Sequence, residues 1–248
     1  MINRVLTACL AAGLLAGLAG AILQEFTTTP LILEAEKYET AAASAPASRF
    51  VATQYGEAKL YLAHSGSHDA PADGAEPWSP EDGLERLSYT TITSIATAFG
   101  FALMLLAVML VSNARITPRT GLAWGAAAFV ATGLAPALGL SPELPGSAAA
   151  VLEYRQTWWL ATVALTAGGL WLVLVLSRSW SIVLGIILIA LPHIVGAPHP
   201  EAYTSVVPSE LAGHFSAASL AVHAVIWAIV GSVIGFMWNR GQRDQAVA

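Results

Sequence analysis

Histidines and carboxylates after one apolar segment form the first candidate for chemistry. Residues 192–200 read Pro-His-Ile-Val-Gly-Ala-Pro-His-Pro and contain His193 and His199, and Glu210 and His214 follow. Glu210 and His214 are four residues apart, so on a helix they share one face. Imidazole and carboxylate together are the ligands that divalent ions such as Zn, Ni and Co take. The alternative is that His193 only caps a helix end by bonding a free backbone group.

Two further carboxylates extend this candidate metal site. Glu143 begins a Glu-Leu-Pro-Gly stretch that resembles the Glu-Leu-Ala-Gly stretch at Glu210. Glu25 ends the first apolar segment, with Glu36 and Glu39 soon after it, and carboxylates at a pore mouth attract cations. Solvated residues at a helix end are the alternative, above all for Glu36 and Glu39. The candidate metal ligands are therefore His193, Glu210, Glu143, Glu25, His199 and His214.

The remaining histidines are weaker candidates. His223 lies inside the last apolar segment, where an ionisable residue faces a cavity or a partner. A neutral histidine that bonds to a neighbouring helix is the commoner case. His64 and His68 lie in a Gly- and Ser-rich stretch with Asp69 and Asp73, which predicts a disordered acidic linker. Loose capture of cations by this linker is the alternative.

Several function classes are disfavoured by what the chain lacks. It has no G-x-x-x-x-G-K-[ST] phosphate loop, no H-E-x-x-H and no G-x-S-x-G, so we expect no enzyme. Cys9 is the single cysteine, which excludes an internal disulfide and a cysteine-built zinc site. The net charge of −5 argues against a nucleic-acid partner. We also expect no prosthetic group.

The elements that must position these residues are apolar segments of membrane-spanning length. The chain has 248 residues, of which 56% are hydrophobic and 11% charged, against about 25% charged in soluble domains. A span needs about 20 apolar residues. We therefore predict an all-α integral membrane protein with one membrane domain over 1–248. The expected elements are about six spans at 5–26, 89–112, 121–138, 157–176, 181–191 and 215–238, and a long outer loop at 33–88.

Spans 1 and 5 are the least typical of the six. Ala19-Gly-Ala21 resembles the cleavage site of a signal peptide, but the apolar run continues past it. Gly13 and Gly17 form a small-xxx-small pair, which favours a packed helix. Span 5 is the shortest, and we expect Pro192 to close it because proline lacks the N–H donor. Whether span 5 crosses fully stays open.

Arginine and lysine in the short loops predict the orientation. With the N-terminus inside, the short outer loops hold only Arg155, and both termini are cytoplasmic. A five-span chain without span 5 would instead leave Arg240 and Arg243 outside. Of the 16 Asp and Glu, only Asp244 is then inside, and all six histidines lie in outer loops or the outer half of span 6. The inner segments hold Arg4, Arg115, Arg119, Arg178, Arg240 and Arg243.

A weak internal repeat relates spans 2 and 3 to spans 4 and 5. Ala135-Pro-Ala-Leu-Gly139 precedes the first Glu-Leu-x-Gly stretch, and Leu191-Pro-His-Ile-Val-Gly196 precedes the second. The two units would be parallel hairpin repeats, and transporters often bind substrate at a repeat interface. Chance similarity between two apolar hairpins is the alternative.

Six short motifs together indicate a family, and through them nearly the whole chain resembles the CbtA family of cobalt transporter subunits. They are Pro30-Leu-Ile-Leu-Glu-Ala-Glu36, Trp78-Ser-Pro-Glu-Asp-Gly-Leu-Glu-Arg86, Leu134-Ala-Pro-Ala-Leu-Gly139 with Pro142-Glu-Leu-Pro-Gly146, Arg155-Gln-Thr-Trp-Trp159, Pro192-His-Ile-Val-Gly-Ala-Pro198 and Val207-Pro-Ser-Glu-Leu-Ala212.

The resemblance implies cobalt uptake in a cobalamin context, in the bacterial cytoplasmic (inner) membrane. It also implies a small single-span, histidine-bearing CbtB-like partner, and a homo-oligomer is a further option. Cobalt, or another divalent metal, would be the transported ion. This chain departs from its relatives in having only His64 and His68 where they often have a histidine-rich stretch. The family is usually described with five spans, whereas the charges and apolar runs here favour six.

We therefore predict a membrane subunit that passes a divalent metal from the outer face to the cytoplasm. The alternative is a membrane scaffold or assembly subunit that transports nothing itself.

Overall fold

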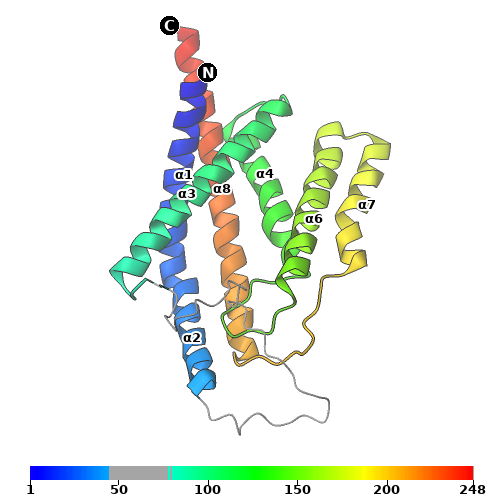
Figure 1. The fold of residues 1–248 in the computed structure, drawn as a ribbon. Coiled ribbons are helices and arrows are strands. Elements are labelled where there is room, and N and C mark those ends of the chain that lie inside the picture. Colours follow the sequence, from blue (N-terminus) through cyan, green and yellow to red (C-terminus); the bar gives the residue numbers. More distant parts are fainter. Residues whose placement is uncertain (45–77, 79, 248) are drawn as a thin grey trace.

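The chain folds into apolar helices joined by loops. The computed structural model describes residues 1–44, 78 and 80–247, and no β-strand occurs among them. Five of its helices are long and apolar enough to cross a membrane, and the shorter apolar helix α7 (Ser179–Val195) is the sixth (Figure 1). The prediction of an all-α membrane protein with about six spans is confirmed. The five long helical segments are α1 (Ile2–Phe26), α3 (Leu84–Val111), α4 with η2 and α5 (Pro118–Phe129, Val130–Leu134, Ala135–Ala137), α6 with η3 (Leu152–Trp171, Leu172–Leu176) and α8 (Ser209–Val247).

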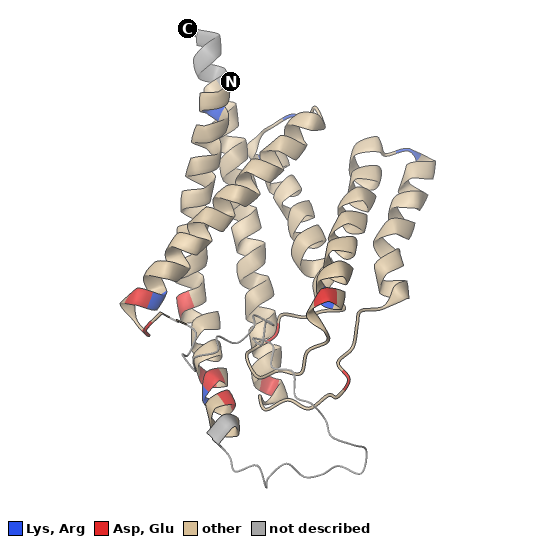
Figure 2. Ribbon diagram, in the orientation of Figure 1, with Lys and Arg blue, Asp and Glu red and all other residues tan. Residues whose placement is uncertain are grey.

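The six helices alternate in direction, so both chain termini lie at the same end of the bundle (Figure 1). The acidic residues coloured red in Figure 2 gather at the opposite end, on α2 (Thr28–Ser44) and on the helix ends and loops beside it. Three described basic residues, Lys37, Arg86 and Arg155, share that end, and each forms an ion pair with a carboxylate. The blue segments at the other end of the bundle mark arginines near the termini and on the loops there (Figure 2).

Helix α7 does not end where the sequence predicted. Pro192 lies inside it, and the helix continues to Val195. The proline removes only one donor near the helix end, while its own carbonyl accepts hydrogen bonds from the Gly196 N–H at 3.0 Å and from Trp158 Nε1 at 3.3 Å. Gly196 ends the helix with a φ of +86°, a conformation open to glycine at little cost. The expectation that Pro192 closes span 5 is therefore wrong.

The long outer segment begins with a helix rather than a loop. Only Thr27 separates α1 from α2, so the described part of the predicted loop at 33–88 is helical up to Ser44 and again from Leu84. Ala35 of α2 is fully buried against Leu144 and Val207. The predicted linker histidines and acids at 64–73 lie outside the described residues.

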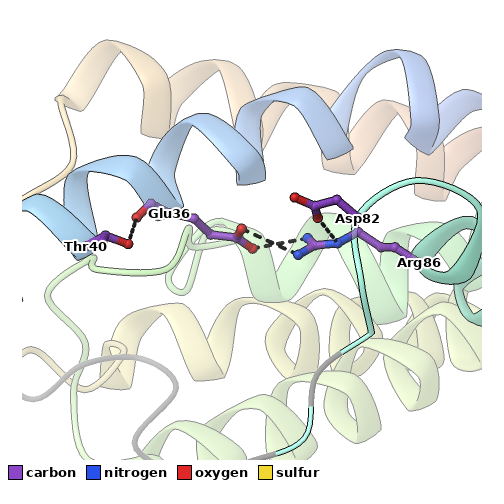
Figure 3. A network of polar contacts seen from close by, with 4 residues as sticks. All are labelled: Glu36, Thr40, Asp82 and Arg86. Carbon is purple, nitrogen blue, oxygen red and sulfur yellow. Dashed lines mark hydrogen bonds and ion pairs between the residues drawn. The ribbon is translucent and has the colours of Figure 1, made fainter. Parts of the chain in front are cut away.

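An ion-pair network joins α2 to the start of α3 (Figure 3). Arg86 Nη1 lies 3.1 Å from Glu36 Oε1, and Arg86 Nε lies 3.0 Å from Asp82 Oδ1. The network fixes the outer helix α2 beside the first turn of a membrane helix.

Glycines let the membrane helices approach closely, as is usual where lipid replaces water. The predicted pair Gly13 and Gly17 lies on α1 against the backbone of α3. On α4, Gly121 and Gly125 lie against the backbone of α8 around Gly231. A side chain at any of these positions would overlap the facing helix.

The two proposed repeat units pack differently. Helix α6 pairs with α7, whereas α3 packs mainly against α1 and α4 mainly against α8. The helix pairing therefore does not follow the two-hairpin repeat suggested by the sequence.

Candidate functional site

One cavity of about 680 Å³ lies between the η2–α5 segment, α6 and the outer half of α8. Its ionisable lining residues are Glu143, Arg155 and His223. The other polar lining residues are Thr132, Ser141, Gln156 and Ser219. The cavity thus combines two charged groups with an imidazole inside a membrane bundle, where such groups are costly and mark function.

An ion pair occupies the part of the cavity nearest the α5–α6 loop. Arg155 in the first turn of α6 places Nη2 2.6 Å from Oε2 of Glu143 in the α5–α6 loop. The two side chains are 23% and 21% exposed, respectively. Burial raises the pKa of the Glu143 carboxyl above its usual value, and Arg155 lowers it by a smaller amount. The environment is therefore dry enough that the pairing only partly offsets the cost of the carboxylate charge.

The loop that carries Glu143 is held on both sides. Leu144 is fully buried in the cluster with Ala35 and Val207. The Ser216 hydroxyl of α8 donates to the Pro142 carbonyl at 2.7 Å. These contacts fix the backbone on either side of Glu143, so the carboxylate has a defined place.

His223 lies deeper in the cavity, seven residues and therefore about 10 Å farther along α8 than Ser216. The Trp227 indole donates from Nε1 to His223 Nε2 at 2.8 Å and to Thr132 Oγ1 at 3.0 Å. Because Nε2 accepts this bond, the neutral imidazole carries its proton on Nδ1. The interpretation of His223 as a neutral histidine bonded to a neighbouring helix agrees with its contact to Thr132.

The helix that faces His223 is irregular. In the π-helical segment η2, the Ala135 N–H donates to the Val130 carbonyl, five residues back. Pro136 follows directly and has no N–H, so it cannot donate a backbone hydrogen bond to the preceding turn. π-Helical segments are frequent at functional sites, and a free carbonyl oxygen can serve as a cation ligand.

The structure places one predicted ligand, Glu143, in the cavity and the other five outside its lining. His193 is half-buried in the last turn of α7, where its ring meets Trp158 edge-on at 6.1 Å. Glu210 and His214 are exposed in the first two turns of α8. Their predicted position on one helix face follows from that helix.

The other two predicted ligands lie on separate elements. His199 is exposed in the loop after α7, with its ring centroid 6.5 Å from that of Tyr203. Glu25 is exposed near the end of α1. Across the described residues, no three His, Cys, Asp or Glu side chains are close enough together to hold a metal ion. The six-residue ligand set therefore stays a prediction.

Sequence reasoning missed Arg155 as a cavity residue. The sequence contains a signal, because Arg155 is the single basic residue of the short outer loops. Its partner could not be identified, since Glu143 lies 12 residues away across an irregular loop.

Three of the short motifs that carry the family resemblance meet around Trp158, which is 9% exposed. They are the motifs at 134–139, 155–159 and 192–198. A Cβ at Gly139 would lie 2.5 Å from the Trp158 ring and 2.8 Å from Ala197 Cβ. The Trp158 indole also bonds to Pro192. Three motifs far apart in the sequence are thus packed into one outer layer beside the cavity.

Comparison with known proteins identifies one family. The searches of curated proteins and of solved structures find no match. The profile of the CbtA family, described as "Probable cobalt transporter subunit (CbtA)", matches residues 2–239, nearly the whole chain. The structure is that of a helical membrane protein, as a transporter subunit requires. The chain belongs to the CbtA family.

Proposed function

We propose that this chain is the membrane subunit of a divalent-metal uptake system, with cobalt as the ion by the family's description. The observation that carries the proposal is the position of the cavity. Its lining includes Glu143 in the α5–α6 loop and His223 inside α8. The acidic residues coloured red in Figure 2 gather at the end of the bundle opposite the termini. Acidic residues around an opening raise the local concentration of cations.

The proposed direction of movement is from the acidic end to the end that carries the termini. The acidic end faces outward in this orientation, and both termini are cytoplasmic. The arginines of the inner loops then obey the positive-inside rule. An inward-negative membrane potential drives a divalent cation this way by about 4.6 kcal/mol per 100 mV, twice the value for a unit charge.

The predicted ligands are proposed to act along this entry route. Glu143 is the single carboxylate in the described lining of the cavity. The other predicted ligands lie outside that lining, on α1, α7, α8 and the loop after α7; they are His193, His199, Glu210, His214 and Glu25. A metal centre that uses several of them requires these elements to move together on binding. Alternating access in transporters is largely a rigid-body movement of one bundle of helices against another, and such a movement is proposed to bring these elements together here.

Cobalt uptake by sealed membrane vesicles tests the proposal. Vesicles would hold this chain alone, then the chain with its proposed single-span partner, and ⁵⁷Co accumulation would be followed with and without a membrane potential. We expect potential-dependent uptake. His193→Ala should reduce it, while the exposed neighbour substitution Ile194→Ala should not. Uptake unaffected by His193→Ala would remove His193 from the ligand set.

The alternative is a scaffold or assembly subunit that moves no ion. It is favoured by the lack of a three-ligand group among the described residues and by the pairing of Glu143 with Arg155. A scaffold predicts no uptake by this chain under any condition, together with loss of the partner's membrane insertion or activity when this chain is removed.

A further inference from the structure

Arg155 occupies the place where a cation in the cavity would meet a carboxylate. Glu143 is the only acidic residue in the described lining of the cavity, and its Oε2 atom lies 2.6 Å from Arg155 Nη2. We propose that Arg155 is a tethered cation that holds the Glu143 carboxylate until a divalent cation displaces it, and that this exchange rejects monovalent cations. The inference rests on the proposed function, which makes this cavity the entry route.

The ion pair between Arg155 and Glu143 is made through one guanidinium nitrogen. Only Nη2 of Arg155 donates a hydrogen bond to the Glu143 carboxylate. Arg86 offers an internal comparison. Its guanidinium lies against both carboxylate oxygens of Glu36, at 3.1 and 3.5 Å, and against Asp82 as well. The Arg155 contact is shorter, at 2.6 Å, but it uses one donor, so a single displacement frees the whole carboxylate, whereas Arg86 must release two contacts to Glu36.

The carboxylate stays in place while the guanidinium can leave. The backbone around Glu143 is fixed by buried Leu144 and by the Ser216 hydroxyl bond to Pro142. Arg155 reaches the carboxylate with a long flexible side chain from the first turn of α6 and keeps 23% of its surface exposed. An arriving cation therefore finds a preformed carboxylate once the guanidinium swings aside.

Charge decides which cation can make the exchange. Coulomb attraction to the carboxylate scales with the charge of the partner. A monovalent ion gains no more attraction than the guanidinium that it replaces, and it also breaks a charge-assisted hydrogen bond. A divalent ion gains about twice the attraction at the same distance. A divalent ion also loses more hydration energy than a monovalent ion when it enters the cavity. Because Arg155 and Glu143 keep 23% and 21% of their side-chain surface exposed, a divalent ion bound at Glu143 can retain part of its water shell. On this basis the tethered guanidinium sets a threshold that divalent ions pass and potassium or sodium does not.

Binding of ⁵⁷Co to the purified full-length chain tests this exchange. Equilibrium dialysis would compare potassium chloride with the same concentration of N-methyl-D-glucamine chloride, whose bulky cation keeps the ionic strength equal. For the natural chain we expect the same cobalt affinity in both salts. Arg155→Gln should bind cobalt about fivefold more tightly in N-methyl-D-glucamine, the effect of losing about 1 kcal/mol of competing pairing. In potassium this gain should disappear.

Two variants control for charge and for structure. Arg155→Lys keeps a tethered cation, so it should keep the insensitivity to potassium. Arg86→Gln removes a comparable ion pair outside the cavity, so it should leave cobalt affinity and salt selectivity unchanged. Arg155→Met is a second neutral variant in case the glutamine variant does not stay monodisperse on size exclusion.

The outcomes separate this inference from the proposed function. If Arg155→Gln matches the natural chain in affinity and potassium insensitivity, the exchange is rejected while cobalt binding stands. If neither the natural chain nor the neutral variants bind cobalt, both proposals fail. If neither neutral variant stays folded, the ion pair is structural and the exchange is rejected.

Discussion

His223 illustrates how a single hydrogen bond sets the chemistry of a residue inside the membrane. The Trp227 indole can only donate, and its Nε1 lies 2.8 Å from His223 Nε2. The imidazole must therefore accept there and carry its proton on Nδ1. For a metal to bind Nε2, it would have to displace the indole first. In the described conformation His223 is thus a neutral polar group of the cavity rather than a ready ligand.

Replacing the indole should change the histidine tautomer. In Trp227→Phe the donor is gone, the ring that stacks on Phe101 at 4.7 Å is kept, and His223 Nε2–H can donate to Thr132 Oγ1. We expect ¹⁵N-histidine NMR to show the Nδ1–H form in the natural chain and the Nε2–H form in the variant. The same tautomer in both would contradict the assigned hydrogen bond.

Glu143 should make the stability of the protein depend on pH. Burial raises its pKa in the folded state, with Arg155 opposing that rise. A carboxyl with a raised folded pKa contributes stability below its unfolded value of about 4.5, and this contribution is lost as pH rises through the folded pKa. The natural chain should therefore lose stability relative to Glu143→Gln as pH rises from about 4 toward neutrality. Thermal unfolding in detergent at several pH values measures this difference, and a constant difference would contradict the assigned pKa direction.

At the scale of the elements, close glycine contacts organise the bundle. The α4–α8 contact brings Gly121 and Gly125 against Gly231, and the α6–α7 contact brings Gly169 against Gly185. Lipid offers apolar surface as favourable as another helix, so close van der Waals packing replaces hydrophobic burial as the source of association. The cavity lies where η2 interrupts the regular helix next to one of these tight contacts.

A methyl group at the α4–α8 contact should destabilise the fold. In Gly231→Ala the new Cβ meets the backbone of α4, so we expect a loss of about 1–3 kcal/mol, as for overpacking in a close-packed interior. Gly100→Ala on α3 is the matched control, because its Cβ would meet no atom within 4 Å. Unfolding by increasing amounts of denaturing detergent measures both. Equal stabilities of the two variants would contradict the packing of α4 on α8.

At the scale of the whole molecule, charge is separated along the length of the helix bundle (Figure 2). The acidic end holds α2, the loop that carries Glu143 and the start of α8, while the other end holds the two termini (Figures 1 and 2). Arg4 links these termini, since its Nη2 donates to the Trp238 carbonyl at 2.6 Å and its guanidinium lies 3.9 Å from the centre of the Trp238 ring. The first and last membrane helices are thereby joined at the end proposed to face the cytoplasm.

The six-span arrangement predicts which loops a membrane-impermeant reagent can reach. Cys9 is buried, and Cys9→Ser leaves a background for single cysteine reporters. A cysteine at Glu201 should react from outside the cell, whereas cysteines at Arg178 and Arg240 should react only after the membrane is opened. Maleimide labelling of intact and permeabilised cells measures this. Labelling of residues 178 and 240 from opposite sides would favour five spans.

The all-α membrane class, the total of about six spans and the one-sided charge were available from the sequence alone. Apolar runs of membrane length and the bias of arginines to one side are local, additive properties, so they survive without knowledge of packing. The predicted helix contact at Gly13 and Gly17 is also confirmed, because the spacing of two small residues is a local signal of a helix contact face. The family motifs were equally local, and the family profile confirms what they indicated.

Only the tertiary structure decided how Pro192, Glu143 and Arg155 are used. Pro192 lies inside α7, which continues to Val195 and is capped by Gly196. The Trp158 indole from the neighbouring helix α6 donates a hydrogen bond to the Pro192 carbonyl, a contact that the sequence does not indicate. Glu143 meets Arg155 rather than the predicted histidines because the α5–α6 loop is folded by its contacts with α2 and α8. Such partners are set by the relative placement of helices, which depends on many weak contacts at once and leaves no periodic trace in the sequence.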